Sequence, residues 1–209
     1  MDSASRWRLP RVLIATDGTE PLELPAPLPD AMLLRDLDLP TLVSVAMSAR
    51  PPLAVDIDTV QGLNADAAAV RFVTGELGMT VVLTRRPAIA AAVAERGCLG
   101  LLHVFAFDST GLDRSLEAHP RRPGVGTTIS PGPVLAHLLP GDLERLPRPL
   151  VAYGLIATHD LVERLLLRAD AVVVSATTAM RLPPAMFAGA GPSHDTARPS
   201  ALDMAGPLR

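Results

Sequence analysis

The chain has 209 residues, a hydrophobic fraction of 48% and a formal net charge of −3. These values are typical of one globular domain and differ from the basic composition of a dedicated nucleic-acid-binding module. No apolar run approaches the ~18 residues of a membrane helix, the start lacks the apolar segment of a secretory signal, and Cys98 is the only cysteine. We therefore expect a cytoplasmic protein without membrane contact or internal disulfides.

Eight short runs rich in Val, Leu and Ile recur along the chain. They cover residues 12–15, 31–34, 53–57, 79–83, 101–107, 126–129, 150–152 and 170–174. Their apolar residues are largely continuous rather than alternating, which is typical of strands buried on both faces of a parallel sheet.

Helical signals fall between these runs. We predict helices with Asn64 as an N-cap, from Pro87 to Arg96, over 110–119 with Ser109 as the cap, and over 158–168 with Thr158 as the cap. Residues 19–29 contain four prolines and are expected to form an irregular loop.

Eight strands that alternate with helices predict an α/β fold, a small (β/α)8 barrel of the TIM type over residues 11–182 with some shortened helices. A flavodoxin-like open sheet of five strands is the alternative. Residues 1–10 are expected to be a flexible N-terminus. Residues 183–209, rich in Gly, Pro, Ala and Ser, are expected to be a disordered tail.

In such a barrel the binding residues lie at the C-terminal ends of the strands. The third predicted strand carries Asp56 and Asp58, which share one side because they are two residues apart. We expect Asp58 at the mouth of the barrel and Asp56 one layer deeper, where it must find a partner. The alternative is a polar interior layer satisfied by neighbouring hydroxyls or arginines.

The fifth strand places His103, Phe105 and Phe107 on one side, with Asp108 at the start of the next loop. His103 is either a ligand-binding residue or a hydrogen-bonded core histidine, and Asp108 with Ser109 can simply cap the following helix. After the sixth strand, Gly132 allows close approach of the backbone.

The last two runs end in Tyr153-Gly154-Leu155-Ile156 and Ser175-Ala176-Thr177-Thr178. Small and hydroxyl residues at such strand ends leave backbone amides free to face a ligand, often a phosphate. We therefore predict a phosphate site at the loops after the seventh and eighth strands.

Five motifs occur in a fixed order: Asp58-Thr59-Val60-Gln61-Gly62, Phe105-Ala106-Phe107-Asp108-Ser109, Ser130-Pro131-Gly132, Ala152-Tyr153-Gly154-Leu155-Ile156 and Val174-Ser175-Ala176-Thr177. In order and spacing they resemble the glycerol-3-phosphate-responsive antiterminators, bacterial regulators with a small barrel fold. The resemblance spans about residues 53–182.

The resemblance implies a transcription antitermination regulator that senses glycerol 3-phosphate, or a similar phosphorylated metabolite, and acts on leader mRNA. No cofactor, metal or catalytic residue is expected, and a homo-oligomer remains open. The residues assigned to ligand and phosphate binding are Asp58, His103, Asp108, Gly132, Gly154, Ser175 and Thr177.

Several pocket positions depart from the family pattern. Asp56 stands in place of His, His103 in place of Arg, Thr128 in place of Glu and Tyr153 in place of the first Gly of a pair, and Asp170 lies near a family glycine. Exchanging Arg for His removes a permanent bidentate phosphate partner. With an ordinary pKa near ~6.5, His103 would strengthen phosphate binding toward pH 6.

Two further interpretations follow from these departures. One is an enzyme or degenerate enzyme for a small phosphorylated substrate, with Asp56, Asp58 and His103 as acid and base. The other is a barrel that has lost ligand binding. The sequence lacks the common nucleotide-binding and hydrolase motifs, and because it has no lysine it excludes Schiff-base chemistry.

Overall fold

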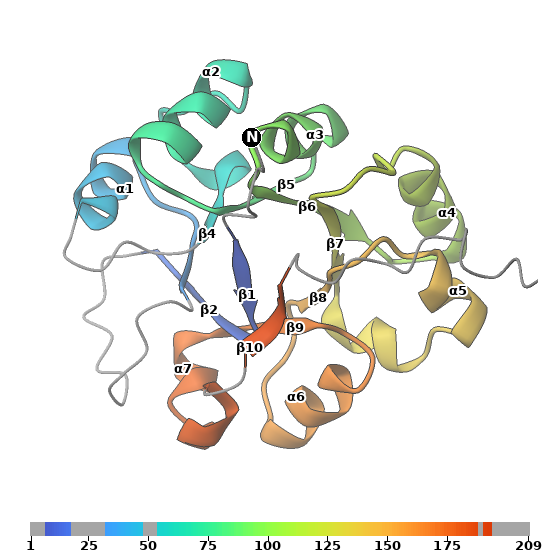
Figure 1. Cartoon of the computed structure of the whole chain (residues 1–209). Coiled ribbons are helices and arrows are strands. Elements are labelled where there is room, and N and C mark those ends of the chain that lie inside the picture. The colour runs from blue at the N-terminus through green and yellow to red at the C-terminus, as the bar shows by residue number, and fades with distance from the viewer. Residues whose placement is uncertain (1–6, 18–31, 48–53, 188–189, 194–209) are drawn as a thin grey trace, which may run out of the picture.

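The computed structural model describes residues 7–17, 32–47, 54–187 and 190–193. It contains a closed parallel barrel (Figure 1) built from β2 (Val12–Thr16), β3 (Met32–Leu34), β4 (Ala54–Asp56), β5 (Val81–Thr84), β6 (Leu99–Phe105), β7 (Val125–Ser130), β8 (Leu150–Tyr153) and β9 (Ala171–Ser175). The strands pair in chain order, and β2 also pairs with β9. The barrel prediction is confirmed, all eight predicted strands are present, and the open-sheet alternative is wrong.

Helices surround the barrel (Figure 1): α1 (Leu39–Ala46), α2 (Ala67–Arg71), α3 (Pro87–Glu95), α4 (Ser109–Glu117), α5 (Pro140–Arg145), α6 (His159–Leu166) and α7 (Ala176–Ala179). Four other helical segments are η1 (Ile57–Thr59), η2 (Phe72–Glu76), η3 (Gly132–Ala136) and η4 (Pro184–Phe187); η2 is a π-helix and the others are 3₁₀-helices. Among the described helices none exceeds nine residues, which explains how so short a chain completes the barrel.

The helix caps agree with the sequence at one position and differ at two. Thr158 caps α6 as predicted. The cap of α4 is Asp108 rather than Ser109, and the cap of α2 is Asp66 rather than Asn64. Neighbouring residues of the same N-cap class compete for such positions, and a carboxylate also complements the positive end of the helix.

The barrel interior is apolar and is closed at one end. Inward-facing side chains such as Leu13, Leu83 and Leu101 form one buried cluster with Trp7 and Leu9. Two further clusters lie between the strands and the outer helices. Leu9 is fully buried and precedes β2 by only a few residues, so it and Trp7 fill the N-terminal end of the barrel.

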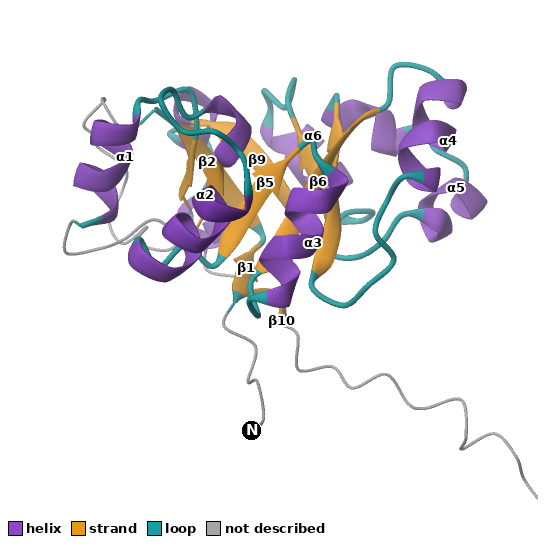
Figure 2. Ribbon diagram, turned by 90° about the horizontal axis from the view of Figure 1, so that it is seen from above, coloured by secondary structure: helices purple, strands orange, loops and turns teal. Residues whose placement is uncertain are grey.

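A small sheet lies below that end. β1 (Arg8–Pro10) pairs antiparallel with β10 (Ala190–Ser193), and both lie at the same end of the barrel in Figure 2. This pair was not predicted from the sequence, and with it regular structure continues beyond both expected barrel limits, 11 and 182. The proline-rich loop predicted over 19–29 lies outside the described residues, as do residues 1–6 and 194–209.

Candidate functional site

The C-terminal ends of the barrel strands, with the first residues after them, form a rim that we call the mouth. Along most strands the inward-facing side chains are apolar in the middle of the barrel and become polar at the mouth; β2 is an exception, because its inward residues are Leu13 and Ala15. The polar layer includes Arg35, Asp56, Arg85, His103, Thr128, Ser130, Tyr153 and Ser175; Thr128 is paired in register with His103 and is fully buried. A polar interior layer satisfied by neighbouring hydroxyls or arginines was one interpretation of the sequence. Asp58 fits it, because it contacts Thr84 and Arg85, whereas Asp56 accepts from a backbone N–H.

Arg35 and Tyr153 meet across the mouth, although their strands, β3 and β8, are not neighbours in the barrel. The guanidinium of Arg35 donates a hydrogen bond to the phenol oxygen of Tyr153 and lies 5.5 Å from the centre of its ring. Arg35 also pairs with Asp36 at 2.6 Å. Burial raises the pKa of Tyr153 to about 12, so the phenol stays neutral.

Asp56 is buried, with 6% of its surface exposed. Burial, followed by the nearby charge of Asp58, raises the pKa of Asp56 to about 6, against the opposing effect of Arg35 and Arg85. Its carboxylate accepts one long hydrogen bond, from the backbone N–H of Asp58 at 3.3 Å. Asp56 is therefore a carboxyl group that exchanges its proton close to neutral pH.

Asp58 lies beyond the strand, in η1, and its side chain is 1% exposed. It accepts hydrogen bonds from Thr84 Oγ1 at 3.1 Å and from the backbone N–H of Arg85 at 2.6 Å. It also lies 3.4 Å from Arg85 Nε and 3.6 Å from Arg86 Nε. Asp58 lies at the mouth end of β4 as expected, but it is buried: it holds the loop between β5 and α3 and so orients the two arginines. Ligand binding by Asp58 stays a prediction.

His103 belongs to a chain of hydrogen bonds. Its Nε2 lies 2.8 Å from Ser130 Oγ, which lies 3.0 Å from the carbonyl oxygen of Tyr153. Because that carbonyl only accepts, Ser130 donates to it and His103 Nε2 must carry the proton. Burial, and then the charges of Arg85 and Arg35, lower the pKa of His103 to about 4. In the unliganded site His103 is therefore neutral between pH 7.5 and 6, and the expected strengthening of phosphate binding toward pH 6 stays a prediction.

Three aromatic rings continue outward from this point. His103 stacks on Phe105 with ring centres 4.4 Å apart, and Phe105 stacks on Phe107 with centres 5.8 Å apart and planes at 11°. Their predicted common side is confirmed. Phe105 is 40% exposed and Phe107 is 79% exposed, so the row runs from the buried mouth to the surface.

The loops after β8 and β9 have backbone geometry suited to exposed amides. Gly154 and Leu155 both have positive φ, 77° and 58°. Ser175 caps the short α7, its Oγ accepting from the backbone N–H of Thr178 at 3.2 Å, and Thr177 is exposed beside it. Ligand binding by Gly154, Ser175 and Thr177 stays a prediction.

Asp108 and Gly132 lie at the same end of the barrel but already have structural contacts. Asp108 Oδ1 accepts from the backbone N–H of Gly111 at 2.6 Å. The N–H of Gly132 donates to the carbonyl of Gly154 at 3.1 Å, and a Cβ on Gly132 would lie 2.9 Å from Ile156 Cδ1. Any part they have in ligand binding would be through the shape of their loops.

Arg35 and Arg85 were not among the site residues predicted from the sequence. Each directly follows an apolar strand, at 32–34 and 81–84, which is the same signal that identified Asp56 and His103. With nineteen arginines in the chain, composition did not distinguish these two from arginines on the solvent side.

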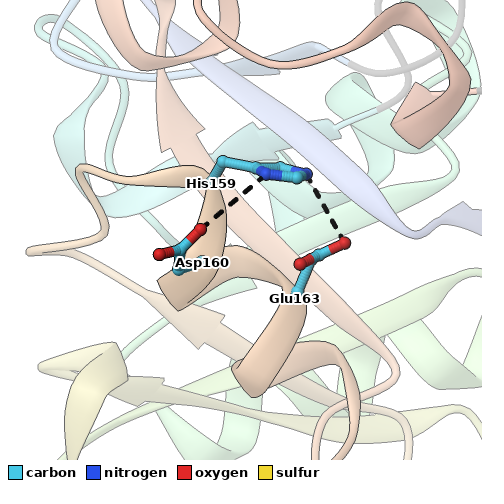
Figure 3. A group of neighbouring side chains, drawn as sticks. All are labelled: His159, Asp160 and Glu163. Carbon is cyan, nitrogen blue, oxygen red and sulfur yellow. Dashed lines mark ion pairs between the residues drawn. The ribbon is translucent and has the colours of Figure 1, made fainter.

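Within the part of the chain that the structure describes, one group of side chains has metal-ligand chemistry: His159, Asp160 and Glu163 at the start of α6 (Figure 3). His159 lies 3.5 Å from Glu163 and 4.0 Å from Asp160, which is 91% exposed. Carboxylates in a first helical turn complement the helix dipole, and a His–Glu pair four residues apart stabilises a helix. These helix-stabilising effects explain why His159, Asp160 and Glu163 lie together, with no need for a metal ion.

Comparisons with known proteins bear on the whole barrel. The model of the family described as "glycerol-3-phosphate responsive antiterminator" matches residues 32–180. Two solved structures are similar. The glycerol uptake operon antiterminator regulatory protein from Listeria monocytogenes has a TM-score of 0.67 and 20% identity, covering 79% of this chain and 91% of that one. The glycerol uptake operon antiterminator-related protein from Thermotoga maritima has a TM-score of 0.68 and 20% identity, covering 83% and 99%.

At this identity the structural likeness shows the fold alone. No curated protein sequence matches the chain significantly. Among the described residues, no helix has the length and apolar character needed to span a membrane.

Proposed function

This chain belongs to the glycerol-3-phosphate responsive antiterminator family, and we propose that its barrel binds a small phosphorylated metabolite, glycerol 3-phosphate or a close analogue. We also propose that the protein acts on leader RNA to prevent transcription termination. The observation that carries the proposal is the polar layer at the mouth of an otherwise apolar barrel. TIM-type barrels bind their ligands at this end, frequently with a phosphate at the last two loops.

The contacts available at the mouth suit such a ligand. Backbone amides near Gly154 and Ser175 would bind the phosphate. Arg35 and Arg85 supply the positive charge that the neutral His103 does not, because both lie within electrostatic range of that imidazole. His103 Nδ1, which has no hydrogen-bond partner among the described residues, is free to accept from a ligand hydroxyl.

A thermal-shift titration of the parent with glycerol 3-phosphate, glycerol and inorganic phosphate tests the metabolite step. A ligand at 100 times its Kd stabilises the folded state by about 2.7 kcal/mol, a rise in Tm of roughly 5 to 10 °C. Gly154→Val should abolish this rise, because a β-branched residue does not tolerate a φ of 77° and the loop must change.

The matched control is Gly78→Val. Gly78 also has a positive φ, 69°, nothing lies within 4 Å of an added Cβ, and the residue precedes β5 at the other end of the barrel. It should lower the starting Tm by a similar amount and keep the ligand response. An equal response in Gly154→Val and the parent would contradict the phosphate position, and no response of the parent to any of the three compounds would favour a barrel that has lost ligand binding.

One observation favours a second candidate function. Asp56 is buried at the mouth and has a pKa of about 6, which suits a general acid or base. The candidate is a proton-transfer enzyme for a small phosphorylated substrate. Prolonged incubation of the protein with glycerol 3-phosphate and related sugar phosphates, followed by phosphorus NMR, tests it. Turnover that Asp56→Asn abolishes would support the enzyme, and unchanged spectra would remove it for those compounds.

A further inference from the structure

The exposed rings of Phe105, at the end of β6, and Phe107, just after it, are not explained by the metabolite site. Phe107 is 79% exposed and Phe105 40% exposed, although the chain has only four phenylalanines. A polyol phosphate has no flat apolar face, so it cannot use the faces of these rings. Exposed aromatic groups that already lie parallel, here at 11°, are suited to a planar partner.

A positive charge lies beside the row. Thr84 of β5 is paired in register with Leu102 of β6, so the following residues, Arg85 and His103, are neighbours on the inward side. The side chain of Arg85 is 56% exposed. Its Nε is 3.4 Å from Asp58 Oδ2. Its two terminal nitrogens, Nη1 and Nη2, have no hydrogen-bond partner among the described residues. A free guanidinium edge beside stacked rings can bind a phosphate while the rings bind a base.

We propose that Phe105 and Phe107 form a stacking platform for an unpaired base of single-stranded RNA, with Arg85 on the adjoining phosphate. The inference rests on the proposed action on leader RNA and names the surface that performs it. RNA recognition in single-stranded segments commonly combines aromatic stacking with cationic contacts, and it does not require a basic protein overall. Because His103 links the row to the mouth, a bound metabolite and a bound base would contact the same strand end.

The test uses the full chain and a fluorescein-labelled 12-nucleotide oligoadenylate RNA, followed by anisotropy. An abasic RNA of the same length keeps the phosphates and lacks the bases. The parent should bind the oligoadenylate more tightly than the abasic strand. Phe107→Ala should weaken oligoadenylate binding about 5- to 150-fold, the range expected for one stacked base, and should leave abasic binding unchanged.

Two variants separate stacking from general apolar contact. Phe107→Leu keeps the apolar character and loses the flat face, so it should bind as weakly as Phe107→Ala. Phe107→Trp should bind at least as tightly as the parent, and its fluorescence should be quenched by the oligoadenylate; Trp7 is buried and provides the background in the parent. The control is Leu167→Ala, which removes a side chain that is 85% exposed on the far end of α6 and should change nothing.

The outcomes distinguish this inference from the proposed function. Parent and Phe107→Ala binding the oligoadenylate equally would overturn the platform and leave RNA action standing. A parent that binds neither strand overturns both the platform and the RNA step, while the thermal-shift response to the metabolite is still read separately. If sedimentation shows a parent dimer that Phe107→Ala dissociates, the rings are a contact between two copies of this chain and the RNA platform is wrong.

Discussion

The two ends of the barrel are built from the same strands and have opposite chemistry. At the N-terminal end Trp7 and Leu9 fill the interior, and the cluster around them is apolar. At the mouth the next inward residues are Asp56, His103 and Tyr153, with pKa values moved to about 6, 4 and 12. Burial is the first cause of each shift. Apolar packing at the N-terminal end thus stabilises the barrel, whereas the buried polar groups at the mouth destabilise it. At the mouth these groups are available to bind a ligand.

The largest expected effect is a difference in the free energy of unfolding between a variant at the N-terminal end and a variant at the mouth. Trp7→Ala should lower the free energy of unfolding by about 3 to 5 kcal/mol, because it leaves a cavity in the apolar end. Tyr153→Phe removes only the hydrogen bond with Arg35 and should cost about 1.5 kcal/mol. Urea unfolding of both variants measures the difference. Equal losses of unfolding free energy in Trp7→Ala and Tyr153→Phe would contradict the view that the N-terminal end contributes most of the stability.

The next effect is the pH dependence of stability, in which Asp56 and His103 act in opposite directions. The raised pKa of Asp56 means that the folded state keeps a proton which the unfolded chain releases above about pH 4, so this stabilisation is lost as pH rises through 6. The lowered pKa of His103 means that the unfolded chain takes up a proton below about pH 6.5, so stability is lost as pH falls toward 4.

Each contribution is at most about 3 kcal/mol, and the two nearly cancel in the parent between about pH 4 and 6. Relative to the parent, Asp56→Asn should gain stability as pH rises from 4 to 7.5, and His103→Gln should gain it as pH falls over the same range. His119, whose pKa burial also lowers, is common to all three proteins and drops out of the differences. Parallel stability curves for the parent and both variants would show that neither group is buried in solution.

The smallest expected effect concerns affinity at the mouth. His103→Arg restores the residue of the family pattern, and a charge-assisted hydrogen bond to phosphate contributes about 1.5 to 3 kcal/mol, or about 10- to 150-fold in Kd. Because the pKa of His103 is about 4, His103 itself should add no pH dependence to binding between pH 6 and 7.5. Asp56 and the phosphate, each with a pKa of about 6, change charge over this range in both proteins, so the parent and His103→Arg should show the same pH dependence of Kd. Calorimetric titration with glycerol 3-phosphate at both pH values checks this. Weaker binding by His103→Arg would mean that Arg35 and Arg85 already repel a third cation.

The fold was predictable because strands buried on both faces are continuous apolar runs, and all eight were visible as such. The β1–β10 pair was not, since Arg8-Leu9-Pro10 and Ala190-Gly191-Pro192-Ser193 are not runs of Val, Leu and Ile, and each contains a proline, which is unfavourable in most strand positions. At the site, alternation placed His103 with Phe105 and Phe107. The same alternation did not predict that the side chain of Asp58 contacts the β5–α3 loop, because η1 begins directly after β4 and a helical turn does not alternate.

The pairing of β2 with β9 has a consequence for the order in which the chain becomes a barrel. Val12 is synthesised long before Val172, with which it pairs, and the backbone N–H of Val172 donates to the carbonyl of Arg11 at 2.9 Å. Neighbouring β–α units can form as they emerge, but the ring cannot close until its eighth strand exists, some 160 residues later. Until then both edge strands of the growing sheet have unpaired backbone groups, and only the pairing of β9 with β2 removes these edges.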